Sequence, residues 1–160
     1  MESKSLKDLN RKLSRIGKAL VKAGADISDD ATRQLAIGAN EIRNTIIQSM
    51  ARGKKTGRWY RKKGGKRHRA SAPGEAPAVD TGELMSRIIY DVRELEMEVE
   101  VGAEAGAPYA VYLEEGTDRM GARPWLTPAV ERHQEDIVKN VGDAAFDVIQ
   151  KGFQKGMGGV

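Results

Sequence analysis

Residues 70–84 read Ala-Ser-Ala-Pro-Gly-Glu-Ala-Pro-Ala-Val-Asp-Thr-Gly-Glu-Leu, and they mark the passage from a basic segment into regular elements. Residues 52–69, directly before them, hold ten Lys or Arg and no acidic residue. The Pro/Gly cluster predicts turns, and Thr81 is a helix-start signal. Loops of this length in a small domain are usually functional or disordered, so we expect a basic loop over residues 52–80.

Two helices are predicted before this loop. Residues 1–24 carry an apolar stripe at helical spacing, and we expect an amphipathic helix lying on the domain or on a neighbour. The second helix begins at Ser28, with Asp29 and Asp30 in its first turn, where the helix dipole favours acids. Gly53 ends it. The stripe of the first helix is Leu6, Leu9, Leu13, Ile16 and Leu20, and the buried face of the second is Ala31, Leu35, Ile42, Ile46 and Met50.

A short helix and a hairpin are predicted after the turn. Thr81 is expected to cap a helix that runs to about Arg87. The β-branched and aromatic run 88–92 predicts one strand, and the alternating run 96–101 predicts a second. With a turn near residues 93–94, these strands form a hairpin with one apolar and one acidic face.

Two more helices follow the hairpin. Pro108 is placed to open a helix over residues 109–115, and Gly116 to close it. Trp125 is predicted to be anchored beside Pro124; the alternative is an exposed aromatic side chain at an interface. A long helix then starts at Thr127-Pro128. Its apolar stripe is Val130, Ile137, Val141, Ala144, Val148 and Phe153, of which Ile137, Val141 and Val148 are expected to carry the core.

The predicted fold is therefore α+β: a small antiparallel sheet with N-terminal helices and a long C-terminal helix packed on it. Residues 25–155 are expected to form one domain, followed by a flexible tail over residues 156–160. A chain of 160 residues with eight aromatic residues has a thin core for its length, so neighbours are expected to add stability.

Charge is unevenly distributed along the chain. The 27 basic and 23 acidic residues give +4, but without the basic segment 17 basic residues face 23 acidic ones, a balance of −6. This asymmetry points to a partner surface, either nucleic acid or the acidic face of another copy. The chain has no Cys, no apolar run of membrane-spanning length and no signal-peptide pattern, which predicts a soluble protein made in the cytoplasm.

The residues predict neither catalysis nor a cofactor. His68 and His133 are far apart in sequence, and no ligand spacing suggests a metal site. No Walker motif or nucleophile elbow is present. Acidic side chains share one strand face, which is either solvated or meets the basic loop of another subunit; they are Glu96, Glu98 and Glu100.

In the basic loop, aromatic residues lie among cations, a composition suited to phosphate contact and base stacking. The alternative is a flexible loop with solvated charges. Candidate contacts to DNA or to a subunit are Arg58, Trp59, Tyr60, Arg61, Lys62, Lys63, Lys66, Arg67 and Arg69. Glu114 and Glu115 end a helix, where the dipole disfavours acids, and Arg119 or Arg123 is the expected intrachain partner.

Three motifs occur in a characteristic order: Trp59-Tyr60-Arg61 leading into residues 70–84, then residues 109–117, then residues 120–129. This series resembles the head–tail joining (tail-completion, or neck) proteins of long-tailed bacteriophages over about residues 40–150. Glu115 departs from that pattern, where a bulky apolar residue is usual. The motif residues expected to be structural are Pro73, Gly74, Pro77, Thr81, Gly82, Leu84, Tyr109, Leu113, Gly116, Thr117, Arg123, Pro124, Trp125 and Pro128.

The resemblance implies a structural virion component made in the host cytoplasm. It implies a homo-oligomeric ring, of six or a similar number of copies, around the DNA channel of the neck or upper tail. Its partners would be other neck and tail proteins and double-stranded DNA, with no membrane. Two rival hypotheses rest on the residues themselves: a nucleic-acid-binding module that uses residues 52–69, and a nuclease that uses the carboxylates.

Overall fold

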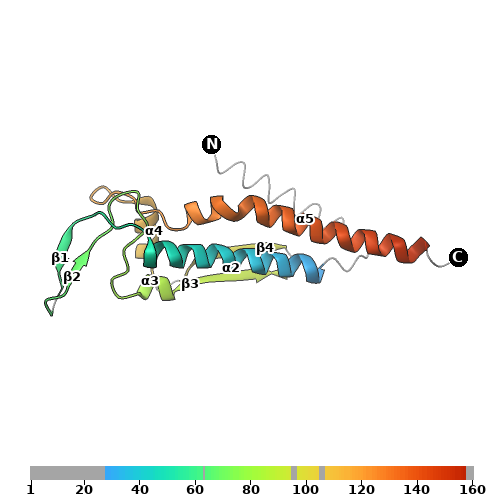
Figure 1. Ribbon diagram of the computed structural model, residues 1–160, viewed down its shortest axis with the longest axis horizontal. Coiled ribbons are helices and arrows are strands. Elements are labelled where there is room, and N and C mark those ends of the chain that lie inside the picture. Colours follow the sequence, from blue (N-terminus) through green and yellow to red (C-terminus); the bar gives the residue numbers. More distant parts are fainter. Residues whose placement is uncertain (1–27, 63, 95–96, 105–106, 158–160) are drawn as a thin grey trace. The chain divides into compact units, whose positions relative to one another are not determined.

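The computed structural model describes residues 28–62, 64–94, 97–104 and 107–157 (Figure 1). The amphipathic helix predicted over residues 1–24 lies outside them. The described elements confirm an α+β protein with two small antiparallel sheets and a long C-terminal helix. In chain order they are α2 (Ser28–Arg52), β1 (Trp59–Arg61), β2 (Arg67–Arg69), α3 (Glu83–Ser86), β3 (Ile88–Arg93), β4 (Glu98–Ala103), α4 (Tyr109–Glu115) and α5 (Thr127–Met157).

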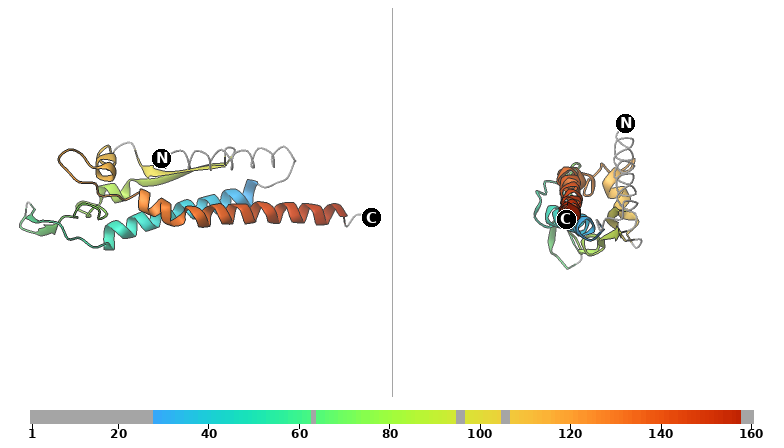
Figure 2. Two further views of the ribbon diagram at one scale, coloured as in Figure 1. Left: turned by 90° about the horizontal axis from the view of Figure 1, so that it is seen from above. Right: turned by 90° about the vertical axis from the view of Figure 1, so that its right-hand side faces the viewer.

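These elements fall into two compact units. One contains the part of α2 up to Ala39, the segment Asp91–Glu100 and α5 from Gln134. The other contains Asn40–Tyr90 and Val101–His133, and therefore holds all three sequence motifs. Figure 2 shows α2 and α5 as continuous helices. The single domain predicted for residues 25–155 stays a prediction.

Helix α2 has the predicted bounds and the predicted buried face. It starts at Ser28 with its acids in the first turn, and it ends one residue before Gly53. All five residues predicted for that face are buried, together with Ala39. A Cβ on Gly38 would lie 2.3 Å from Cγ1 of Ile137, so the absence of a side chain there allows α5 to pack closely against α2. Ile137 and Val141 are buried as predicted, whereas Val148 is only half-buried.

The hairpin β3–β4 confirms the predicted pairing with a shifted second strand. Its first strand begins at Ile88 as expected, but its second begins at Glu98 instead of residue 96. Met97 has a φ of 50°, in the left-handed region, and its backbone N–H donates to the Glu94 carbonyl over 3.3 Å. A residue with that backbone belongs to a turn, so strand pairing can resume only after it.

The basic segment forms a second hairpin, which corrects the prediction of an irregular loop. Trp59 pairs with Arg69, Tyr60 with His68 and Arg61 with Arg67. Gly64 and Gly65 make the turn with positive φ angles of 97° and 82°, conformations that glycine adopts without steric cost. Two short runs joined by a short glycine-containing connection, here residues 62–66 with Gly64-Gly65, are a hairpin signal, but strands of only three residues hide it.

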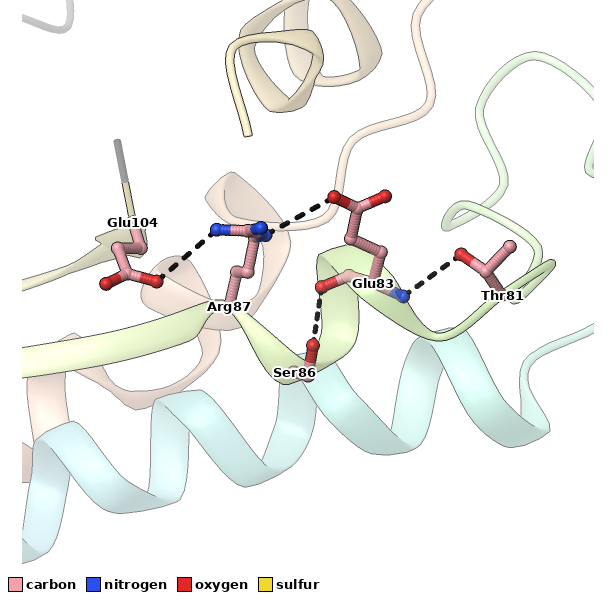
Figure 3. Close-up of polar contacts among 5 residues, drawn as sticks. All are labelled: Thr81, Glu83, Ser86, Arg87 and Glu104. Carbon is pink, nitrogen blue, oxygen red and sulfur yellow. Dashed lines mark hydrogen bonds and ion pairs between the residues drawn. The ribbon is translucent and has the colours of Figure 1, made fainter. Parts of the chain in front are cut away.

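The start of α3 differs by one residue from the prediction. Gly82 occupies the cap position in a left-handed conformation, φ 84°, and supplies no side chain. The Thr81 hydroxyl still accepts a hydrogen bond from the Glu83 backbone over 3.3 Å (Figure 3). The sharp turn requires glycine directly before the helix, which moves the threonine one position outward. Arg87 then lies 3.5 Å from Glu83 and 3.6 Å from Glu104, linking α3 to the residue after β4 (Figure 3).

Candidate functional site

The first and third motifs meet in space. The Gly74 backbone donates a 2.8 Å hydrogen bond to the Ala122 carbonyl, and Nε of Arg123 donates to the carbonyl of buried Ser71 over 3.2 Å. Gly121 also packs against Pro73, because a Cβ on this glycine would lie 2.9 Å from the proline ring. The turn cluster is thus held by the segment that leads into α5.

The second motif joins the same junction. The Arg123 backbone donates to the Leu113 carbonyl at the end of α4 over 2.6 Å. Gly116 closes α4 with φ 80°, and a Cβ there would lie 2.8 Å from the backbone of Met120 and Ala122. Trp125 is buried beside α4, and its Nε1 donates to the Ala110 carbonyl over 3.0 Å, which confirms the predicted anchor. We call this convergence of three motifs the motif junction.

Glu114 connects α4 to the start of α5. Its carboxylate accepts hydrogen bonds from three consecutive backbone N–H groups, those of Trp125 (2.7 Å), Leu126 (2.9 Å) and Thr127 (2.9 Å). The expected partnership with Arg119 or Arg123 is therefore wrong, and Arg123 donates to carbonyls instead. The positive end of the α5 dipole, and the N–H groups there that have no acceptor within the helix, attract the carboxylate.

Two opposing effects act on the pKa of the Glu114 carboxyl. Burial raises this pKa, but the hydrogen bonds from the Leu126 backbone, the Thr127 side chain and the Trp125 and Thr127 backbones together hold it below its ordinary value. A carboxyl whose pKa is depressed by folding stabilises the folded state above its unfolded pKa. That stabilisation is lost as the pH falls through the folded pKa.

Replacing Glu114 by alanine is expected to destabilise the protein by about 2 kcal/mol at neutral pH, because a charged acceptor and a helix cap disappear together. The difference from the wild type should shrink as the pH falls below about 4.5. Urea unfolding followed by circular dichroism at several pH values measures it.

The neighbouring Glu115 is exposed and supplies the control, since Glu115→Ala should change the unfolding free energy by less than about 0.5 kcal/mol. Equal costs for the two alanine variants at neutral pH would contradict the capping role of Glu114.

The base of the β1–β2 hairpin is attached to the motif junction. Glu75 accepts hydrogen bonds from the Thr56 hydroxyl (2.6 Å) and from the backbones of Thr56 and Ala72 (2.8 Å each). These bonds, with the charge of Lys55, lower the pKa of the Glu75 carboxyl to about 2. Lys55 itself donates to the carbonyls of Ser49 and Ala76. The base of the β1–β2 hairpin is therefore hydrogen-bonded to the turn cluster through Glu75, whose carboxylate stays charged over the physiological pH range.

The two faces of the hairpin differ in chemistry. Residues paired across an antiparallel ribbon, or two apart along a strand, share a face. Tyr60 and His68 share one, with ring centroids 5.1 Å apart in an edge-on arrangement. The opposite face, which we call the arginine face, consists of Trp59, Arg61, Arg67 and Arg69, all exposed.

The remaining predicted contact residues of the segment lie outside this face. Lys62 is paired with the Asp80 carboxylate and donates to its carbonyl, so it is less available to a partner. Arg58 and Lys66 are exposed, and Lys63 lies outside the described residues.

The acidic strand face has a cationic partner within the chain. Arg93 of β3 lies 3.5 Å from Glu98 and 2.9 Å from Glu100 of β4. Glu96 lies outside the described residues. A hairpin with acids on one strand and an arginine opposite is a typical cross-strand arrangement, and sequence spacing alone does not reveal it.

Two shallow pockets adjoin the motif junction. One, of about 210 Å³, is lined by Met50, the segment 77–85, Tyr109 and Leu113. The other, of about 390 Å³, lies between the end of β4, α4 and Trp125. Among the described residues, no group of three or more His, Asp or Glu could hold a metal ion, and none of the described helices could cross a membrane.

A family model described as "Bacteriophage HK97-gp10, putative tail-component" matches residues 4–116. The chain belongs to this family. The match includes the leucine-striped segment, which the resemblance had been expected to exclude, and it ends at Gly116, before the third motif. Comparison with curated proteins and with solved structures found no match.

Membership in the HK97 gp10-like family confirms the phage resemblance and makes this protein a tail component of a bacteriophage, a structural part of the virion. The motif junction joins the end of α4 to the start of α5 and carries the base of the β1–β2 hairpin. In the sequence, the signal for Glu114 is an acidic residue at the C-terminal end of a helix, where the dipole disfavours it. In the structure, this carboxylate caps the start of α5.

Proposed function

We propose that this tail component acts at the neck or upper tail, where copies of the chain form a ring that helps to join the DNA-filled head to the tail. The observation that carries the proposal is the motif junction, in which the third motif of the head–tail joining resemblance is hydrogen-bonded to both the first and the second. Other neck and tail proteins are its further partners, and assembly takes place in the host cytoplasm.

Exposed apolar side chains support an assembling protein. Val111 and Tyr112 on α4 are 55% and 57% exposed, and Val111 lines the larger of the two pockets. Ile89 and Tyr90 on β3 are also exposed. Large apolar side chains in such positions are often covered by a partner.

The proposed role needs no cofactor and no catalytic group. Of the carboxylates suggested for a nuclease, the two that the structure describes, Glu98 and Glu100, form cross-strand ion pairs with Arg93. A nucleic-acid-binding module remains the second candidate, and the arginine face of the hairpin is the observation that favours it.

Ring formation is tested by native mass spectrometry of the purified protein, alone and with isolated tails. The wild type should give one closed oligomer under at least one of these conditions. Tyr112→Ser should move the equilibrium to the monomer, raising the concentration needed for assembly about tenfold or more, since it removes an exposed aromatic side chain that the proposed ring interface would bury.

Lys139→Ser, on the exposed side of α5, is the surface control and should assemble like the wild type. A wild-type protein that stays monomeric at every concentration, with tails and without them, would overturn the ring.

A further inference from the structure

The arginine face holds cations without an acidic partner. The described residues place no carboxylate within ion-pair distance of Arg61, Arg67 or Arg69, although Lys62 beside them has Asp80. Neighbouring positive charges repel each other, which opposes their clustering on one face of the folded hairpin. Such a face is best explained by an anionic partner outside the chain.

Trp59 organises these arginines. The guanidinium carbon of Arg67 lies 5.4 Å and that of Arg69 5.6 Å from the centre of the Trp59 ring. Guanidinium groups held against an aromatic ring are positioned by cation–π attraction and still have N–H groups to donate to phosphate oxygens. Arg69 also donates to the carbonyls of Thr56 and Gly57 over 3.4 Å, which ties it to the base of the hairpin.

The same contacts argue against stacking on bases. Single-stranded nucleic acid is bound largely by bases that stack on free aromatic rings. Here the ring of Trp59 is engaged by two guanidinium groups, and the ring of Tyr60 by His68 on the other face. The sequence-based expectation of base stacking therefore gives way to contacts with phosphates.

An acidic protein surface is the weaker alternative. The acidic strand of another copy would have to give up Arg93, which already lies against Glu98 and Glu100. A two-stranded ribbon, in contrast, fits the major groove of B-DNA, which is about 12 Å wide. The hairpin is such a ribbon, separate from β3–β4 (Figures 1 and 2).

We propose that the β1–β2 hairpin binds the phosphate backbone of double-stranded DNA through its arginine face, without reading sequence. The inference rests on the proposed neck function only for which DNA is bound, namely the DNA that passes from the head through the neck. Binding needs no ring, so the free protein suffices to test it.

The test measures the affinity for a 30-base-pair duplex of mixed sequence by fluorescence anisotropy at several salt concentrations. The variant is Arg61→Gln with Arg67→Gln, which keeps Arg69 at the base of the hairpin. Its affinity at low salt should fall more than about tenfold. The slope of log affinity against log salt should fall by about 0.9 for each DNA phosphate that the variant no longer neutralises.

The control is Arg132→Gln with Lys139→Gln, which removes the same charge from exposed positions on α5 and should keep most of the affinity. The variant with both arginines changed to lysine should also keep most of it, because the interaction with phosphate is electrostatic. Amide exchange at residues 59–61 and 67–69 shows that the hairpin is still formed.

Several results would overturn the inference. They are no duplex binding by the wild type at low salt, equal reductions of affinity in the hairpin variant and the α5 control, or tighter binding of single-stranded DNA that depends on Trp59. A hairpin variant that binds DNA normally but no longer assembles would identify a protein partner instead. Native mass spectrometry of the same samples reports the ring separately, so failure of the ring and failure of DNA binding are distinguishable.

Discussion

Replacing Trp125 by alanine is expected to destabilise the protein by about 3–5 kcal/mol, the cost of emptying a large buried aromatic site. Trp125 is only 4% exposed and packs against α4, where its Nε1 donates to the Ala110 carbonyl over 3.0 Å. The variant loses both the buried surface and the hydrogen bond. Urea unfolding followed by far-ultraviolet circular dichroism measures the change without relying on tryptophan fluorescence.

Two variants make this result specific. Trp125→Phe keeps most of the apolar volume and should cost about 1–2 kcal/mol more than an exposed substitution, mainly because the Ala110 carbonyl no longer receives its hydrogen bond. Trp59→Ala removes a tryptophan that is 53% exposed and should cost less than about 1 kcal/mol. Similar unfolding free energies for Trp125→Ala and Trp59→Ala would show that Trp125 does not anchor the motif junction.

Replacing Ile137 by alanine is expected to cost about 2–4 kcal/mol, because it leaves a cavity where α2 and α5 pack closely. Ile137 is 9% exposed, and its side chain lies against Gly38 of α2. Because glycine has no side chain, nothing at this position of α2 can fill the cavity that Ile137→Ala would leave. The unfolding midpoint in urea gives the change.

Lys139→Ala, two residues further along α5, is the exposed control and should change the unfolding free energy by less than about 0.5 kcal/mol. Should Ile137→Ala shift the midpoint no more than this control, the packing of Gly38 against Ile137 would be refuted.

Local signals predicted most of the element boundaries. Helix α2 begins at Ser28 and stops before Gly53, and α4 runs between Pro108 and Gly116, as expected from residues that cap or break helices. The predicted register of buried residues on α2 was confirmed for the same reason, since an apolar stripe at helical spacing has one way to be buried. An apolar stripe does not by itself predict how far burial extends along a helix. Val148 belongs to the predicted stripe of α5 but is only half-buried.

Misses occurred where a boundary depends on backbone geometry or on very short elements. The left-handed backbone of Met97 belongs to the turn, so β4 starts later than the alternation of side chains predicts. At α3, Gly82 occupies the cap position that the sequence assigns to Thr81. Three-residue strands carry almost no periodic signal, so the sequence predicts a loop where the structure has the β1–β2 hairpin. Its Gly64-Gly65 turn was the one local sign of pairing.

The sequence by itself determined the helices that the structure describes, the β3–β4 hairpin, the phage family resemblance and the concentration of charge in residues 52–69, since each depends on neighbours along the chain. Only the tertiary structure decided which groups meet across long separations. It placed Glu114 at the start of α5, Arg93 on the acidic strand and two arginines against Trp59. A charge can be satisfied by any opposite charge or dipole within reach, and the fold alone determines which one is there.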